Sequence, residues 1–227
     1  MSFKEIVPYL KEAAADLRYL LARGYPKAAA LTLVGNRHRL THTARQLLHR
    51  GVAPPEVAAA RRAKMRLLAE IPGQPLAVDG HNVLITLECA LRRLPLVAAD
   101  DGFIRDVGQV SRAFRPSRET DRVLALLADY LARHPVGALS VFFDAPLSLS
   151  GELAWRTREV WGARGLTVTA AAVAVPEREL AAFAGPVASS DTAVIDAHDL
   201  VVDLAGEIIR QELQVEMIYL DKAQEGV

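Results

Sequence analysis

The sequence predicts an α/β protein: a three-layer domain with a parallel sheet over residues 73–227, preceded by a small all-helical domain over residues 1–72. The chain has 227 residues, of which 51% are hydrophobic, enough for a packed core. Before residue 72 the apolar residues recur every three to four positions, as in amphipathic helices. After residue 75, short apolar runs alternate with helical patterns, as in a parallel sheet covered on both faces.

The basic N-terminal part is expected to be entirely helical. Gly24 ends the first helical pattern, and Thr41 is a suitable N-cap for the third. Residues 71–75, Ile-Pro-Gly-Gln-Pro, mark the domain boundary, because two prolines and a glycine in five residues break regular structure. The expected helices cover residues 6–21, 27–34, 41–49 and 54–70.

The second part is expected to alternate strands and helices. Trp155 is expected to pack on the sheet, and ligands of such sheets gather at the carboxyl ends of the strands. The expected strands cover residues 76–78, 138–143, 166–175, 186–188, 200–204 and 215–219. The expected helices cover residues 83–94, 105–114, 119–133, 151–163, 176–183 and 205–212.

The formal net charge of zero conceals an asymmetry between the two parts. Residues 1–73 carry 13 Lys and Arg against 5 Asp and Glu, whereas residues 74–227 carry 14 against 22. The basic part is suited to a polyanion and the acidic part to a metal ion. Equally, the two parts can simply attract each other.

Several protein classes are excluded by what the sequence lacks. No apolar run is long enough to span a membrane, and the N-terminus does not resemble a signal peptide, so we expect a cytoplasmic protein without a membrane partner. A single cysteine, Cys89, allows neither an internal disulfide nor a cysteine-based zinc site. No glycine-rich phosphate loop and no Gly-x-Ser-x-Gly elbow occurs.

Three acids follow predicted strands and form the candidate catalytic set: Asp79, Asp144 and Asp191. Such acids can converge at one sheet edge and bind Mg²⁺ or Mn²⁺. Asp79 and Asp191 are the candidate metal ligands of this set. The alternative is that Asp79 or Asn82 caps the helix that follows, that Ser189 or Ser190 caps the later one, and that Asp144 makes a turn.

Further candidates for metal binding come from neighbouring loops and helix starts. Asp101 or Asp106 would add a ligand, although Arg105 can instead be the partner of this acidic cluster. Glu177 and Glu179 begin a short helix after a strand; one of them can reach the metal, and the alternative is that both simply favour the helix dipole.

Other polar residues are candidates for contact with a substrate. His81, Asn82, Ser189 and Ser190 lie beside the predicted acids and are suited to phosphate oxygens. A basic helical face for an RNA backbone would consist of Arg37, Arg39, Arg45 and Arg50; the alternative is an ordinary solvated surface.

Three motifs resemble the PIN-like nuclease superfamily, including its NYN branch: Val78-Asp-Gly-His-Asn-Val83, Val141-Phe-Phe-Asp144 and Val187-Ala-Ser-Ser-Asp191. The resemblance covers the C-terminal two-thirds and implies a metal-dependent ribonuclease, with Asp79 and Asp191 at the positions of family acids. The whole chain also resembles the prokaryotic domain-of-unknown-function family 434, through Asp16-Leu-Arg-Tyr-Leu-Leu-Ala-Arg-Gly-Tyr25 and Leu33-Val-Gly-Asn-Arg37.

The leading hypothesis is therefore a Mg²⁺- or Mn²⁺-dependent ribonuclease whose partner is RNA. The Ala-Asp-x-x-Ile helix start of many PIN nucleases is replaced here by Pro176-Glu-Arg-Glu179, which leaves open a catalytically inactive module that binds RNA or protein. A phosphatase- or kinase-like enzyme ranks last, because a phosphate-binding glycine loop is missing. The sequence leaves the oligomeric state open, including a homo-oligomer.

Overall fold

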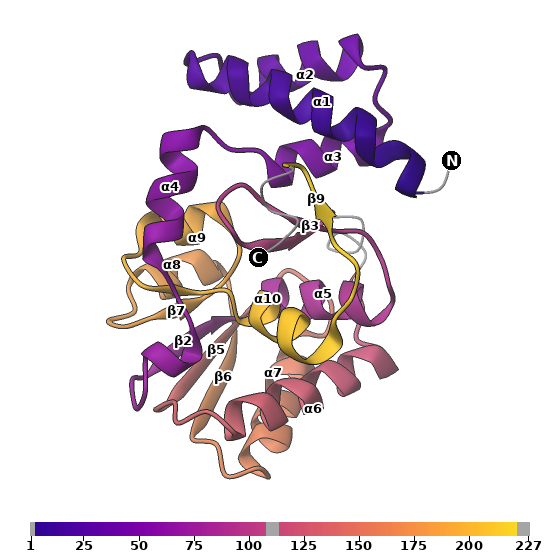
Figure 1. Cartoon of the computed structure of the whole chain (residues 1–227). Helices are drawn as coiled ribbons and strands as arrows, with labels where there is room; N and C mark the ends of the chain where they lie inside the picture. The colour runs from indigo at the N-terminus through magenta and orange to yellow at the C-terminus, as the bar shows by residue number, and fades with distance from the viewer. Residues whose placement is uncertain (1–2, 108–113, 222–227) are drawn as a thin grey trace. The chain divides into compact units, whose positions relative to one another are not determined.

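The computed structural model describes residues 3–107 and 114–221, with side chains from residue 9 onward (Figure 1). The chain divides into two compact units. The helical unit comprises residues 1–63, 95–109 and 216–227, and the sheet unit comprises residues 64–94 and 110–215. None of the helices in the described ranges combines the length and the hydrophobicity that a membrane span requires.

The helical unit is discontinuous in sequence, whereas the sequence predicted a single domain boundary between residues 72 and 73. Val97, Val107, Ile218 and Leu220 are buried in the same core as the residues of the first three helices, such as Leu17. These later segments therefore belong with the N-terminal helices, because their apolar side chains complete that core.

The described part of the helical unit combines helices with a small sheet. Thr41 caps the third helix, as predicted, by accepting a hydrogen bond from Ala44 N at 3.3 Å. The fourth helix ends at Lys64, well before the predicted residue 70. The helices are α1 (Phe3–Ala22), α2 (Lys27–Arg37), α3 (His42–Gly51) and α4 (Pro55–Lys64).

Three short strands in the described part of this unit form its sheet, in the order β4-β3-β9. They are β3 (Leu96–Ala98), β4 (Ile104–Asp106) and β9 (Ile218–Tyr219). The helix predicted over 105–114 is wrong at Arg105 and Asp106, which lie in β4 and pair antiparallel with β3. The remainder of that prediction lies mostly outside the described residues. The strand predicted over 215–219 exists, but it pairs parallel with β3.

The described part of the sheet unit contains six parallel strands in the order β1-β8-β7-β2-β5-β6, which confirms the predicted parallel sheet. The strands are β1 (Met65–Arg66), β2 (Leu76–Asp79), β5 (Leu139–Asp144), β6 (Val168–Val173), β7 (Val187–Ala188) and β8 (Val201–Val202). Counted in chain order from β2, the five strands beyond β1 lie in the order 3-2-1-4-5. From β2 the chain adds β5 and β6 on one side, and it then returns to add β7 and β8 on the other side of β2.

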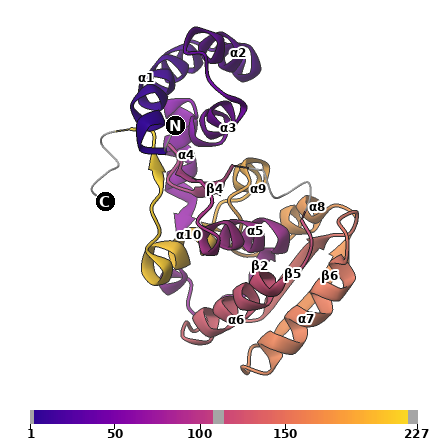
Figure 2. The ribbon, with the colours of Figure 1, turned by 90° about the vertical axis from the view of Figure 1, so that its right-hand side faces the viewer.

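The sheet unit's helices connect these strands. They are α5 (Gly80–Leu91), α6 (Arg118–Ala132), α7 (Ser150–Gly162), α8 (Pro176–Ala181), α9 (Thr192–Ala197) and α10 (Leu204–Ile208), with a 3₁₀ turn at Leu68–Glu70 and a π-helical turn at Ile209–Leu213. Figure 2 shows α6 and α7 packed side by side next to β5 and β6. Because parallel crossovers are right-handed, the reversal of strand order places α8 and α9 on the opposite face.

The core of the sheet unit lies between the strands and α5, α6 and α7. Val141 and Phe143 of β5 face Leu124 of α6 and Trp161 of α7 around a small apolar cavity. Trp161 is 1% exposed, and its Nε1 donates a hydrogen bond to Leu124 O at 3.1 Å. The prediction for Trp155 is wrong: its side chain is 54% exposed, because it lies on the outer side of α7.

Candidate functional site

The strand order reverses between β2 and β7, and the carboxyl ends of these two neighbours hold the candidate site. Ligands of open α/β sheets bind at this kind of reversal. Asp79 is the last residue of β2, and Ser189 directly follows β7. The register pairs Val78 with Ala188, so Asp79 and Ser189 are adjacent. Ser189 Oγ donates a hydrogen bond to Asp79 Oδ2 at 2.9 Å.

Further hydrogen bonds join the same two strand ends. Asn82 Oδ1 accepts hydrogen bonds from Ser190 N at 2.8 Å and from Ser190 Oγ at 3.1 Å. Ser189 Oγ accepts one from Asp191 N at 3.0 Å. The structure therefore brings together five of the residues that the sequence selected: Asp79, Asn82, Ser189, Ser190 and Asp191.

Asp79 and Asp191 both cap helices; for Asp79 this is the alternative that the sequence left open, whereas the serines were expected to form the later cap. Asp79 accepts a hydrogen bond from Asn82 N at 3.4 Å at the start of α5, and Asp191 accepts one from Ala193 N at 2.8 Å at the start of α9. A carboxylate has about four lone-pair sites, so a capping role leaves room for a second partner. The two roles are compatible.

Two further acids share this face of the sheet. Asp79 pairs with Phe142 in the parallel register, so the side chains of Asp79 and Asp144 lie on the face opposite Val141 and Phe143. Glu177 begins α8, which contacts β2 and β5. Asp144 lies at the end of β5, as predicted, and is partly exposed.

Two of these acids, Asp79 and Asp144, have a raised pKa. Burial raises the pKa of Asp79 to about 7, and the negative charges of Asp191 and Glu177 add to this shift, while the hydrogen bonds from Ser189 and Asn82 oppose it. Burial, and secondarily Glu177, also raises the pKa of Asp144. From the sequence, Glu177 was only one of several acids at a helix start. It comes near Asp79 because the chain crosses back over the sheet between β6 and β7.

The donor atoms at this site are carboxylate and hydroxyl oxygens, which suit a hard cation such as Mg²⁺ or Mn²⁺. Among the residues that the structure describes, no group of three or more His, Cys, Asp or Glu side chains is arranged to hold one metal ion. The described residues therefore do not form an all-protein metal cage at these strand ends.

His81 lies in the first turn of α5, between two aromatic rings. It is 6% exposed, and its ring makes edge contacts with Phe114 and Phe143 at centroid distances of 5.4 Å and 5.2 Å. Its Nδ1 accepts a hydrogen bond from Asp144 N at 2.9 Å. Burial lowers the pKa of His81 to about 4, so the ring is neutral at pH 7 and carries its proton on Nε2. His81 therefore positions the end of β5.

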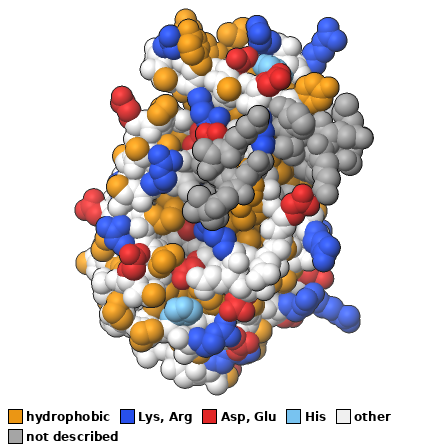
Figure 3. Space-filling model, viewed as in Figure 1, with side chains coloured by type: hydrophobic (Ala, Val, Ile, Leu, Met, Phe, Trp, Pro, Cys, Tyr) orange, Lys and Arg blue, Asp and Glu red, His pale blue; other side chains and the backbone are white. Residues whose placement is uncertain are grey.

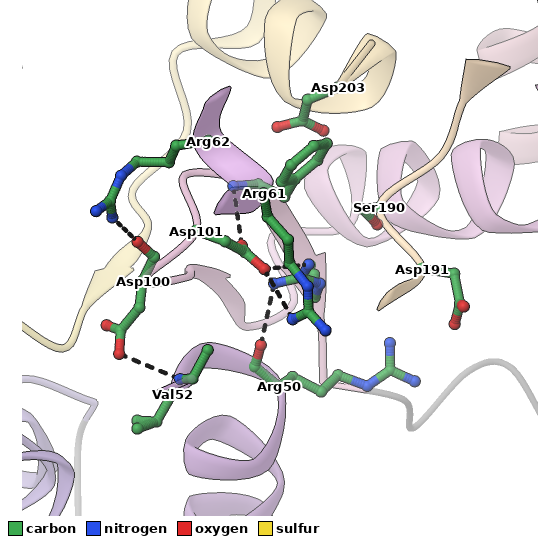
Figure 4. Close-up of polar contacts among 12 residues, drawn as sticks. Arg50, Val52, Arg61, Arg62, Asp100, Asp101, Ser190, Asp191 and Asp203 are labelled. Carbon is green, nitrogen blue, oxygen red and sulfur yellow. Dashed lines mark hydrogen bonds and ion pairs between the residues drawn. The ribbon is translucent and has the colours of Figure 1, made fainter. Parts of the chain in front are cut away.

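Asp101 and Asp106, the other predicted metal ligands, belong to the helical unit, where their partners are arginines. Figure 4 shows Asp101 next to Arg61. Asp101 is buried and accepts two hydrogen bonds from Arg105, each 2.8 Å long, and forms a further ion pair with Arg61 at 3.3 Å. Asp106 forms an ion pair with Arg50 at 3.5 Å. Asp101 therefore pairs with Arg105, which is the alternative to metal binding that the sequence offered.

Ion pairs within the helical unit explain part of the charge asymmetry between the two parts of the chain. Arg18 donates two hydrogen bonds to Asp100, at 2.6 Å and 2.8 Å, and Arg62 donates one to the carbonyl of Asp100. Arginines of the basic N-terminal part thus pair with the acidic residues of segment 95–109. Attraction between the two parts accounts for some of the basic excess.

The four arginines of the predicted basic face differ in their surroundings. Arg45 donates hydrogen bonds to Leu40 O at 3.1 Å and to Asn36 Oδ1 at 3.0 Å, and Arg50 pairs with Asp106. Arg39 is exposed. The side chain of Arg37 is 73% exposed and forms an ion pair with Asp16 at 3.2 Å. Arg37 and Arg39 are therefore the members of this set whose side chains reach solvent most freely.

Two family models match the chain, and the boundary between their matches lies close to the end of α4. The family model described as "Protein of unknown function (DUF434)" matches residues 9–64, and the model described as "Domain of unknown function (DUF5616)" matches residues 68–207. The Uncharacterized protein MJ0935 of Methanocaldococcus jannaschii is 30% identical over 202 residues, which are 88% of this chain and 96% of that protein. No solved structure matches.

The resemblance to family 434 is thus confirmed for the N-terminal helices, while residues 68–207 match a different family model. Neither description names a nuclease. With 140 of its 227 residues matched from 68 to 207, the chain belongs to the family described as Domain of unknown function (DUF5616).

Proposed function

We propose that the sheet unit is a PIN-like, Mg²⁺- or Mn²⁺-dependent ribonuclease, with Asp79 and Asp191 as the metal ligands. The observation that carries the proposal is the position of these two acids at the reversal of strand order, where the 3-2-1-4-5 sheet collects ligands. The pKa of Asp79, raised by burial and further by the charges of Asp191 and Glu177, adds support, because a cation would stabilise a buried negative charge.

The absence of a three-ligand cage among the described residues is compatible with Mg²⁺. This ion keeps several waters and commonly binds through one or two carboxylates together with substrate phosphates. When bound, it would activate a water and neutralise charge on the phosphate. Asp144 would assist from the neighbouring strand end, with its backbone held by His81.

The polar residues between the strands would bind the phosphate. The amide oxygen of Asn82 is held by Ser190, which leaves its NH₂ group as a donor for a phosphate oxygen. Ser189 keeps Asp79 in one orientation through its hydroxyl group. Fixed orientation of ligands and donors is the main contribution that a protein makes to this kind of chemistry.

The test is cleavage of a labelled single-stranded RNA by the purified full chain with Mn²⁺ or Mg²⁺. Asp79→Asn and Asp191→Asn should each reduce the rate by at least about 10²-fold, as expected for loss of preorganised electrostatics. Asp129→Asn, an exposed carboxylate on α6, is the matched control and should cleave as the wild type does. Equal cleavage by wild type and Asp79→Asn would refute the proposal.

A second candidate function is a catalytically inactive module that binds RNA or protein. It is favoured by the capping roles of Asp79 and Asp191, which give both acids a structural purpose. RNA binding without metal, lost steeply as salt increases and unaccompanied by cleavage, would support it over the ribonuclease.

A further inference from the structure

Among the described strands of the six-stranded sheet, β6 is an edge strand whose hydrogen-bonding groups on one side face outward. Leu139 N donates a hydrogen bond to Thr167 O, and Ala145 N donates one to Val173 O, so the odd-numbered residues along β6 are bonded to β5. The N–H and C=O groups of residues 168, 170 and 172 therefore point away from the sheet. An edge of this kind is a template for pairing with another strand.

The sequence of β6 lacks the features that usually protect such an edge. Residues 166–175, Leu-Thr-Val-Thr-Ala-Ala-Ala-Val-Ala-Val, contain no charge, proline or glycine. By contrast, the strand at the other end of the sheet, β1, is two residues long and ends in Arg66. Arg158 of α7 donates a hydrogen bond to Ala170 O at the edge of β6. A carbonyl oxygen has two lone pairs, so Ala170 O can still accept a hydrogen bond from a second strand.

The exposed Trp155 lies on the flank of α7 that is next to this edge. On the opposite flank, Arg156 forms an ion pair with Asp121 of α6 at 3.0 Å, so α6 lies on that side. Arg158 is two residues further along and therefore lies across the helix from Arg156, where it reaches Ala170. Trp155 comes three residues before Arg158 and shares its flank. Its side chain is 54% exposed.

A two-fold axis perpendicular to the sheet would bring the strand edge and the tryptophan of two copies together. Antiparallel pairing of β6 with β6 of a second copy extends the sheet and places both α7 helices on one face, antiparallel to each other. Because α7 contacts both β5 and β6, its axis lies about half a strand spacing inside β6. The two helix axes would then be about 10 Å apart, which is the usual distance between packed helices.

The charges around this edge favour a second copy of the chain as the partner. Glu152 and Glu159 are exposed on either side of Arg158 along α7, so an antiparallel second α7 brings glutamates toward each arginine. The formal net charge of the chain is zero, and on the face of the sheet unit shown in Figure 3 acidic and basic side chains are interspersed. Two copies therefore meet without the repulsion that a large field of one sign would cause.

We propose that the chain forms a two-fold dimer in which β6 pairs antiparallel with β6 of a second copy and Trp155 is buried between the two α7 helices. The candidate site lies at the ends of β2 and β7, and β5 separates β2 from the dimer edge. The proposal is therefore independent of the reaction that the site performs.

The test is sedimentation equilibrium of the full chain from about 1 to 100 μM, the range of moderate interface affinities. The wild type should be a dimer. Trp155→Ala should weaken dimerisation at least about tenfold, because buried tryptophans dominate interface energies. Ala172→Pro removes one outward N–H group, spares the hydrogen bonds to β5 and should also weaken dimerisation. The emission of Trp155 should shift to the blue as the dimer forms, since the second tryptophan, Trp161, is already buried.

Two further variants keep the test decisive. Ala172→Lys places a charge at the exposed edge and should weaken dimerisation even if the proline variant fails to fold. Tyr19→Ala removes a 57% exposed aromatic ring from the helical unit and should leave the dimer unchanged. A monomeric wild type at the highest concentration would overturn the proposal. So would a dimer that persists in Trp155→Ala and Ala172→Lys, because the contact would then belong to another surface.

Discussion

Ser189 Oγ and Asp79 Oδ2 are 2.9 Å apart, and their hydrogen bond joins the ends of two neighbouring strands across 110 residues of sequence. The bond lowers the pKa of Asp79, but burial outweighs it. The carboxyl group therefore titrates near neutrality.

The free energy of unfolding should depend on pH through Asp79. Its pKa is about 7 in the folded state and 3.8 for an aspartate exposed to water, so the folded state binds more protons between these values. The resulting stabilisation of the folded state is fully present below pH 3.8. It is lost as the pH rises through 7, which lowers the free energy of unfolding by up to about 4 kcal/mol. Urea unfolding without divalent cations, from pH 4.5 to 8, should show this decline in the wild type relative to Asp79→Asn. Identical pH profiles would contradict it.

Mn²⁺ binding, measured by calorimetry, should tighten as the pH rises from 6 to 8. The ion must displace the proton of Asp79, and below the pKa each pH unit changes the affinity by up to about tenfold. Asp79→Asn should bind Mn²⁺ weakly, without this pH dependence, and Asp129→Asn should match the wild type. A pH dependence that survives in Asp79→Asn would assign the proton to another group.

His81 should remain neutral well below its usual pKa. Burial lowers that pKa from 6.5 to about 4, so its contribution to stability is present above pH 6.5 and is lost as the pH falls toward 4, by up to about 3 kcal/mol. Nitrogen-15 NMR should show the Nε2–H tautomer at pH 5.5. His81→Gln should lose less stability than the wild type between pH 6.5 and 4. An imidazolium signal at pH 6 would contradict the assignment.

The ion pair between Arg18 and Asp100 should stabilise the helical unit. Its side chains are 20% and 10% exposed, and removing one partner of such a pair costs about 3–5 kcal/mol. Arg18→Ala should therefore lower the free energy of unfolding, and hydrogen exchange should accelerate first in the helical unit. The matched control is Arg164→Ala, which breaks an exposed pair with Asp129 and should cost at most about 1 kcal/mol. Equal costs would show that burial of the Arg18 pair has no effect.

Local signals explain what could be predicted from the sequence. Thr41 and Asp79 were recognisable because a cap and a strand end depend on neighbouring residues. The apolar runs that form β2 and β5 were recognisable because both faces of the sheet are covered. The meeting of the ends of β2 and β7 followed from the rule that parallel strands share a carboxyl edge, whereas the sequence assigned Asn82, Ser189 and Ser190 to a substrate and not to one another.

Contacts between distant segments explain what could not be predicted. The strand Ile104–Asp106 is too short for a periodic pattern, and β3 and β9 complete its sheet from elsewhere in the chain. The exposure of Trp155 and the burial of Trp161 depend on how α7 is rotated against the sheet. The exposure of Tyr19 and Tyr25 is equally invisible in the sequence, because only the position of the unit's core reveals it.

The discontinuous core of the helical unit has a consequence for the order of events on the ribosome. The helices α1 to α4 emerge first, but Ile218 and Leu220, which close their core, are translated after the whole sheet unit. The sheet unit has all its strands once residue 202 has been made. Domains usually mature in the order of translation. Here the segment synthesised first completes its core only when the last part of the described chain has been made.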